Sequence, residues 1–171
     1  STTAPEKPVW TRDPRNKLAD LPNVGLPGDF FYSPETKLGE WIEYNGSVLS
    51  IDPSGRGKDE TGYAVVKMLN GYLYVAECGG LRGGYKDENL QSLSVIAKRN
   101  NVNLILIESN FGDGMFMELL KPVLRKVHNV SMEEIRSSVQ KEKRIIDTLE
   151  PVMNQHRLVI DPKVIEKDYQ T

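Results

Sequence analysis

Cysteine and histidine are scarce in this chain. It contains one cysteine, Cys78, and two histidines, His128 and His156. A single cysteine cannot form an internal disulfide, and the two histidines are too far apart in the sequence to act as a helical pair of zinc ligands. These absences argue against a disulfide-stabilised domain and a zinc site. Cys78 is expected to be a small buried residue rather than a nucleophile.

Long hydrophobic runs and an excess of one charge are also missing. No apolar stretch approaches the roughly 20 residues that cross a membrane, and no basic and apolar leader opens the chain. We therefore expect a soluble intracellular protein that does not bind membranes. The formal net charge is −2 over 171 residues, which is not typical of a globally basic nucleic-acid-binding protein. Local clusters of cations must carry any such binding.

Residues 1–46 are expected to form a proline-rich arm or inter-domain linker. They hold six of the ten prolines and show no sustained period of helix or strand. Their aromatic residues, such as Trp10 and Trp41, predict that parts of the arm pack on the domain. The pattern changes at Ser47, so one folded domain is expected over 47–171.

The rest of the chain alternates short apolar runs with amphipathic segments. Strands are expected at 48–52, 62–69, 72–77, 102–108, 127–130 and 157–160. Helices are expected at 87–100, 115–126 and 140–154. Asn70-Gly71 is a strong signal for a hairpin turn between the second and third strands. The order predicts an α/β fold with a mixed sheet, three antiparallel strands followed by parallel strands, flanked by helices.

Two of the predicted strands end in an acid. Asp52 and Glu108 each follow an apolar run and precede a polar loop that contains glycine. If the two strands are parallel neighbours, both carboxylates emerge at the same carboxyl edge of the sheet, where open α/β sheets bind ligands. Carboxylate oxygens suit Mg²⁺ or Mn²⁺, and two such ions about 4 Å apart can promote phosphodiester hydrolysis. Strand-end acids also commonly cap loops or pair with a cation such as Arg56.

The context of both acids resembles a known family. The run Asp-Pro-Ser-Gly-Arg-Gly-Lys-Asp-Glu-Thr-Gly-Tyr-Ala-Val at 52–65 is similar to the nuclease motif of bacteriophage terminase large subunits, particularly those of short-tailed podophages. Glu-Ser-Asn-Phe-Gly-Asp-Gly at 108–114 looks like the second acidic motif of that family. The resemblance covers about residues 46–171.

The resemblance implies a ribonuclease H-like fold and a divalent-metal-dependent endonuclease that cuts concatemeric double-stranded phage DNA during genome packaging. Asp52 and Glu108 would be its catalytic metal ligands for Mg²⁺ or Mn²⁺, with two ions expected, and Asp113 is a further candidate that could act through water. The family's third carboxylate is expected beyond Thr171, so the domain would lack its C-terminal segment. The isolated fragment is then expected to bind metal more weakly and to be a weak or inactive enzyme. The implied partners are DNA, an N-terminal ATPase domain, the portal protein and the small terminase subunit, in the host cell cytoplasm.

Two groups of cations are candidates for contacts with DNA phosphates. Arg56 and Lys58 lie in the loop after Asp52. Lys141, Lys143 and Arg144 begin a predicted helix, where positive charge opposes the helix dipole. A solvated surface is the alternative interpretation for both groups.

Two other functions remain open from the sequence. An actin-like or sugar-kinase-like half also begins with three antiparallel strands and an aspartate-containing glycine turn, and it would bind ATP. The length of this chain and its Glu-Ser-Asn motif argue against that interpretation. A non-catalytic module with the same fold, used for DNA binding or portal docking, would not cleave DNA in the presence of metal.

Overall fold

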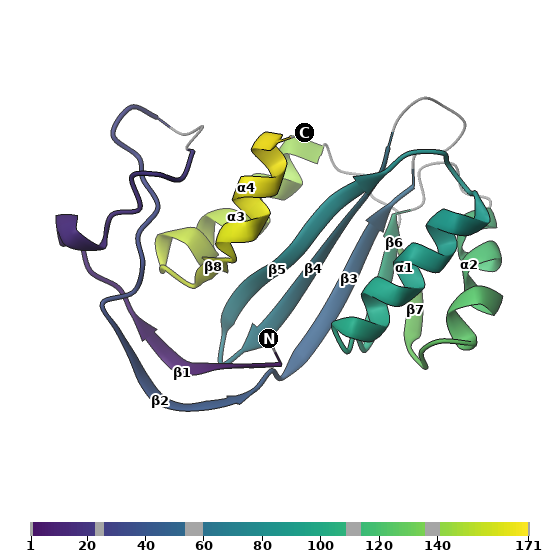
Figure 1. Cartoon of the computed structure of the whole chain (residues 1–171), viewed down its shortest axis with the longest axis horizontal. Helices are drawn as coiled ribbons and strands as arrows, with labels where there is room; N and C mark the ends of the chain where they lie inside the picture. The colour runs from purple at the N-terminus through teal and green to yellow at the C-terminus, as the bar shows by residue number, and fades with distance from the viewer. Residues whose placement is uncertain (1, 23–25, 54–59, 109–113, 136–140, 171) are drawn as a thin grey trace.

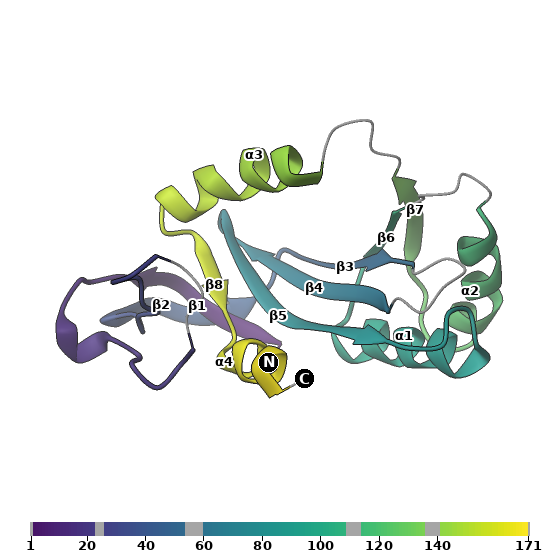
Figure 2. The same cartoon turned by 90° about the horizontal axis from the view of Figure 1, so that it is seen from above.

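The structure is a computed structural model that describes residues 2–22, 26–53, 60–108, 114–135 and 141–170. Over these residues the chain forms a small two-stranded sheet and a six-stranded mixed sheet (Figure 1). Helices lie on both sides of the larger sheet when the molecule is seen from above (Figure 2). Within the same ranges, no helix is long and apolar enough to cross a membrane.

The proline-rich arm contains more regular structure than its sequence predicts. Strands β1 (Thr3–Val9) and β2 (Thr36–Glu43) pair antiparallel, with an irregularity between Pro5 and Lys7. Between them lies the short 3-10 helix η1 (Pro14–Asn16). Nearly all of β2 is exposed, so this strand has no alternation of buried and exposed residues that the sequence could reveal. Strand β1 contains prolines, which are tolerated in edge strands but are not typical of strand sequences.

The three antiparallel strands are confirmed. They are β3 (Gly46–Asp52), β4 (Thr61–Leu69) and β5 (Tyr72–Leu81). Asn70 and Gly71 both have positive φ, 50° and 82°, as a two-residue hairpin turn requires. In β4 buried residues alternate strictly with half-buried ones, which makes one face of this strand part of the core.

The second half alternates helices and strands. Its elements are α1 (Asp87–Arg99), β6 (Leu104–Glu108), α2 (Met115–Arg125), β7 (Ser131–Ile135), α3 (Lys141–Asn154), β8 (Leu158–Ile160) and α4 (Pro162–Gln170). The strand order across the sheet is β7-β6-β3-β4-β5-β8, and β4 alone runs against the other five. The predicted mixed sheet is therefore confirmed.

The strand predicted at 127–130 is wrong. The amides of Val127 and His128 both donate to the carbonyl of Leu124, so this segment closes the end of α2 and the strand starts only at Ser131. Helix α4 was not expected. In α3, Pro151 lies in the last turn, in agreement with the prediction that it stands near the end of the helix.

One face of the larger sheet packs against α1 and α2, and we call it the helical face. Its strand residues are buried together with apolar residues of the two helices. The fully buried members from β3 and β6 are Leu49, Ile51, Ile105 and Ile107. Alternate residues point to the opposite face, which we call the open face. Figure 2 shows α3 on that side of the sheet.

Candidate metal centre at the carboxyl edge of the sheet

Asp52 and Glu108 end two strands that are parallel neighbours, as predicted. The register of β3 and β6 runs from Val48 opposite Leu104 to Ile51 opposite Ile107. Asp52 and Glu108 are the next residue of each strand. Because neighbouring strands lie about 4.8 Å apart, the two residues stand side by side at one edge of the sheet.

Both acids also belong to the same face. In-register residues of parallel strands point to the same side, and in both strands the residue before the acid is buried on the helical face. Asp52 and Glu108 are half-buried and belong to the open face. Their side chains are therefore near one another and accessible to a ligand that approaches this edge.

The donor chemistry of this pair fits a hard divalent cation. Two carboxylates supply oxygen ligands of the kind that Mg²⁺ and Mn²⁺ prefer, and such ions keep several water molecules in addition to their protein ligands. Among the described residues, no group of three or more acidic, histidine or cysteine side chains is arranged around a common metal position. The candidate ligand Asp113 lies outside the described residues.

The candidate DNA-binding cations are only partly described. Arg56 and Lys58 lie outside the described residues. Lys141, Lys143 and Arg144 fall in the first turn of α3, where Lys143 is exposed, and the side chains of the other two are not described. Figure 2 shows that α3 lies on the same side of the sheet as the open face. The structure thus brings Asp52 and Glu108 together and places one candidate cation, Lys143, in solvent.

Sequence reasoning missed the neighbours of Asp52 on its other side. Gly62 of β4 is in register with Asp52, and Gly80 of β5 is in register with Gly62. The side chain of Glu60 lies over Gly80, and its carboxylate accepts a hydrogen bond from Arg82 Nε at 2.9 Å. The hairpin turn alone could not reveal that Gly80 lies opposite Gly62, because the β4–β5 register shifts between Val65 and Val66.

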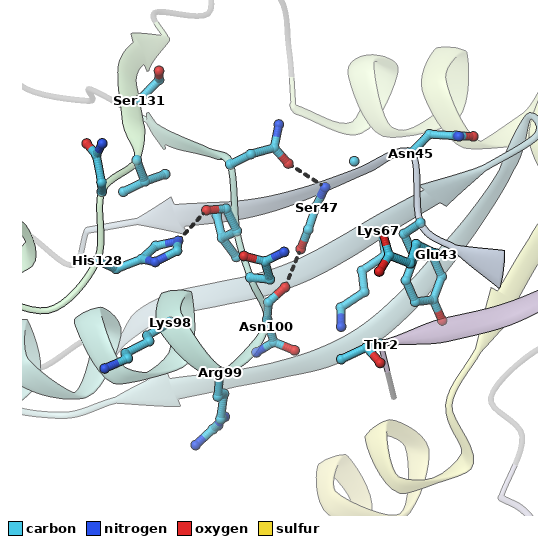
Figure 3. A pocket seen from close by; sticks show the side chains of 17 residues that line it. Thr2, Glu43, Asn45, Ser47, Lys67, Lys98, Arg99, Asn100, His128 and Ser131 are labelled. Carbon is cyan, nitrogen blue, oxygen red and sulfur yellow. Dashed lines mark hydrogen bonds between the residues drawn. The ribbon is translucent and has the colours of Figure 1, made fainter.

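A second site lies at the opposite end of the strands. It is a cavity of about 840 Å³ between the arm and the amino ends of β3 and β6, beyond the end of α1 (Figure 3). The buried Lys67 lines it, with its Nζ 5.2 Å from the centre of the Tyr44 ring. Burial lowers the pKa of Lys67, and the negative charge of Glu77 partly opposes this effect.

Hydrogen bonds within the chain occupy much of the polar lining of this cavity. The Ser47 amide donates to Asn103 Oδ1 at 2.7 Å, and the Ser47 hydroxyl donates to the Asn100 carbonyl at 3.0 Å (Figure 3). A ring nitrogen of His128 lies 2.6 Å from the Val102 carbonyl oxygen. Glu43 is the one acid among the described residues that line this cavity, so these residues do not supply the carboxylate pair that a hard cation needs.

Comparison with known families assigns the region of the larger sheet to a protein family. Residues 51–158 match the model of the ribonuclease H-like domain of the bacteriophage T7 terminase. The chain belongs to this family. The match begins at the end of β3 and reaches β8, so it includes both Asp52 and Glu108. Membership in this terminase family implies a nuclease in general terms.

Individual relatives agree with this assignment. The chain is 51% identical over 168 residues to the terminase large subunit of Enterobacteria phage T3. This alignment covers 98% of the present chain and 29% of the T3 protein. The chain therefore spans less than a third of the length of this relative. Similar solved structures include the large terminase of the thermophilic bacteriophage D6E, with a TM-score of 0.53, 10% identity and coverage of 74% and 31% of the two chains.

A viral terminase outside the phages has the same fold. The human cytomegalovirus terminase nuclease domain, soaked with Mn and bound to an inhibitor, matches with a TM-score of 0.51 and 8% identity over 71% of this chain and 65% of that one. At such low identity the two structures share the fold alone. The predicted ribonuclease H-like architecture is confirmed by these neighbours together with the family match.

Proposed function

We propose that this chain is a divalent-metal-dependent endonuclease domain that cleaves concatemeric double-stranded DNA during phage genome packaging. In this proposal Asp52 and Glu108 are the catalytic metal ligands for Mg²⁺ or Mn²⁺. The observation that carries it is the register of β3 and β6, in which these two acids end neighbouring parallel strands on one face. The Mn-soaked nuclease domain of the cytomegalovirus terminase has the same fold, which supports the choice of metal.

The residues of the chain would divide the work as follows. Asp52 and Glu108 would hold the cations at the carboxyl edge, with Asp113 as a further candidate through water. When bound, a pair of such ions activates a water molecule on one side of the phosphodiester and stabilises the leaving oxygen on the other. Each acid extends from a strand buried in the core, so the ligands are held by a rigid support.

Cations around the edge would bind the DNA backbone. We propose that Arg56, Lys58, Lys141, Lys143 and Arg144 contact phosphates that flank the cut. Such contacts position DNA without reading its sequence, and they compensate for the absence of a net positive charge on the chain.

The relative from phage T3, a terminase large subunit, supports a wider assignment. We propose that the arm at 1–46 connects the nuclease domain at 47–171 to an ATPase domain. We further propose that a third carboxylate lies C-terminal to Thr171. In the host cell cytoplasm, the partners of this protein would be double-stranded DNA, the portal protein and the small terminase subunit.

The test is plasmid cleavage combined with metal binding. We expect the chain, extended at its C-terminus to include the proposed third carboxylate, to bind Mn²⁺ and to nick or linearise supercoiled plasmid. A chelator should abolish the cleavage. Asp52→Asn and Glu108→Gln should each lower the cleavage rate by about 100-fold or more, since removal of one strong electrostatic contribution to catalysis costs that much.

Glu88→Gln is the matched control because it removes the same charge from an exposed position in the first turn of α1. It should cleave like the unchanged protein. Cleavage that persists undiminished in both edge variants would refute the assignment, as would Mn²⁺ binding that does not depend on Asp52 or Glu108. In the extended chain, metal binding at these acids without any cleavage would favour a non-catalytic DNA-binding or docking module.

A further inference from the structure

A glycine beside the proposed metal centre has no visible role in folding. Gly62 lies directly opposite Asp52, in the strand on the other side from Glu108. The order across the carboxyl edge is therefore Glu108, Asp52, Gly62 and Gly80, one residue from each of four adjacent strands. In-register residues share a face, so a side chain at position 62 would stand on the open face next to the Asp52 carboxylate.

The backbone conformation does not require glycine here. The glycines with positive φ are elsewhere in the chain, at positions such as Gly71 and Gly114, and Gly62 is not among them. Glycine in the interior of a strand is unfavourable, because it loses more conformational freedom on folding and has no side chain to pack. A β-branched residue would be expected to stabilise this strand.

Packing does not require glycine either. A Cβ built on Gly62 meets no atom of the described residues within 4 Å. This differs from Gly80, where the added carbon would collide with the side chain of Glu60, and from Gly46, where it would lie 2.9 Å from the Met68 methyl. Gly62 thus leaves an open space that no described part of the protein fills.

The borders of this space define what fits into it. On one side is Asp52, one strand spacing of about 4.8 Å away. On the other side Glu60 lies across Gly80, with its charge compensated by Arg82. The side chain of Arg82 is 86% exposed, so it offers hydrogen-bond donors to a ligand that enters the space from solvent.

We propose that the bare backbone at Gly62 receives the sugar-phosphate backbone of the DNA strand that is cut, immediately beside the phosphodiester held at Asp52 and Glu108. Glycine in a strand allows another chain to approach closely, and here it lets the substrate lie flat against the sheet edge. Arg82 faces a phosphate at the far border of the space. Gly62 is therefore a positioning residue, and this inference rests on the proposed nuclease function.

The test compares substrates of different size in variants that fill the space. Gly62→Ala and Gly62→Val should unfold at the same or a higher temperature than the unchanged protein and should bind Mn²⁺ with unchanged affinity. DNA cleavage, measured as kcat/KM on a defined duplex with Mn²⁺, should fall about 10-fold for alanine and about 100-fold for valine, because a misplacement of the order of 1 Å carries such a cost. Hydrolysis of bis(p-nitrophenyl) phosphate, a small activated diester, should stay unchanged.

Each alternative outcome has a separate meaning. Normal DNA cleavage by Gly62→Val would overturn the inference and leave the proposed function intact. Equal loss of activity on DNA and on the small diester, or weaker Mn²⁺ binding, would also overturn it, because the added side chain would then disturb the metal centre itself. If the unsubstituted protein, extended at its C-terminus as in the plasmid test, shows no metal-dependent cleavage, the proposed function itself is refuted. Ala64→Val, two residues further along the same face of β4, is the control for added bulk away from the edge.

Discussion

The two faces of the six-stranded sheet use the same strands for different purposes. In β6, Ile105 and Ile107 are 0% and 1% exposed on the helical face, whereas Leu104, Leu106 and Glu108 on the open face are only partly buried. The helical face supplies the apolar burial that stabilises the domain. The open face contributes less to that core. Its carboxyl edge carries the two acids and Gly62, where no described residue lies within 4 Å of an added Cβ.

This difference suggests how a stable fold accommodates an acidic site. Two neighbouring carboxylates repel one another, and the interior residues that precede them must hold the strands in place. Ile51 and Ile107 do so from the helical face, one residue before each acid. Substitutions on the helical face should therefore change stability, and substitutions at the carboxyl edge of the open face should change metal binding and catalysis.

The largest effect on stability is expected from Ile107→Ala. Its side chain is fully buried in the core cluster, so truncation should lower the free energy of unfolding by about 2–5 kcal/mol. Leu106→Ala, the adjacent residue on the open face, should cost less than half as much. Urea denaturation of both variants measures the difference, and equal losses would contradict the division between the two faces.

The metal should stabilise the protein through the open face. At a Mn²⁺ concentration 100 times its Kd, a ligand that binds only the folded state raises the free energy of unfolding by about 2.7 kcal/mol. We expect this gain for the unchanged protein and for Glu88→Gln. It should disappear in Asp52→Asn and Glu108→Gln. Thermal unfolding with and without Mn²⁺ checks this, and an equal gain in all four proteins would place the metal elsewhere.

Much of the sheet was predictable because local signals determined it. Asn70-Gly71 predicted the hairpin, and the apolar runs before Asp52 and Glu108 predicted two buried strands. The order of elements then made those strands parallel neighbours, which brought the two acids to one edge. These features depend on turn chemistry and periodicity, both of which are written in short stretches of sequence.

The missed features depend on pairing between distant residues. Strands β1 and β2 are joined by backbone pairing across the arm, and their prolines and exposed residues hide that pairing from pattern analysis. The position of Gly62 opposite Asp52 depends on the β3–β4 register, which no turn signal between these two strands specifies. The acids of the candidate site could be predicted from the sequence, whereas the space beside them could not.

A smaller loss of stability is expected at the polar end of the helical face. Asn103 accepts the amide hydrogen of Ser47, a residue with 5% exposure, so Asn103→Ala leaves a buried donor without this partner. The cost should be about 1–3 kcal/mol in the free energy of unfolding. Asn129→Ala, at an exposed position of the same cavity, is the control and should change stability little. A similar effect of the two substitutions on urea denaturation would argue against the role of this hydrogen bond.

The smallest effect, and the one with a distinctive pH dependence, is expected at Lys67. Burial holds its pKa below the ordinary value of 10.5, so the unfolded chain binds the proton more tightly than the folded protein does. Below the folded-state pKa this penalty is fully present, and it is relieved as the pH rises from that value towards 10.5. Lys67→Met should therefore be more stable than the unchanged protein by about 1 kcal/mol at neutral pH, with the advantage shrinking in alkaline solution.

Urea denaturation of Lys67→Met and the unchanged protein between pH 7 and about 9.5 tests whether this stability advantage shrinks as the pH rises. The range ends there because Tyr44, beside Lys67, has a pKa raised by burial and stays neutral up to that pH. Lys98→Met is the matched control, since it removes the same charge from an exposed residue of the same cavity. A Lys67→Met variant that is less stable at neutral pH would mean that the contacts of the ammonium group with Tyr44 and its other partners outweigh the cost of burying it. Plasmid cleavage should be unchanged in both variants, because the cavity lies at the end of the strands opposite to Asp52 and Glu108.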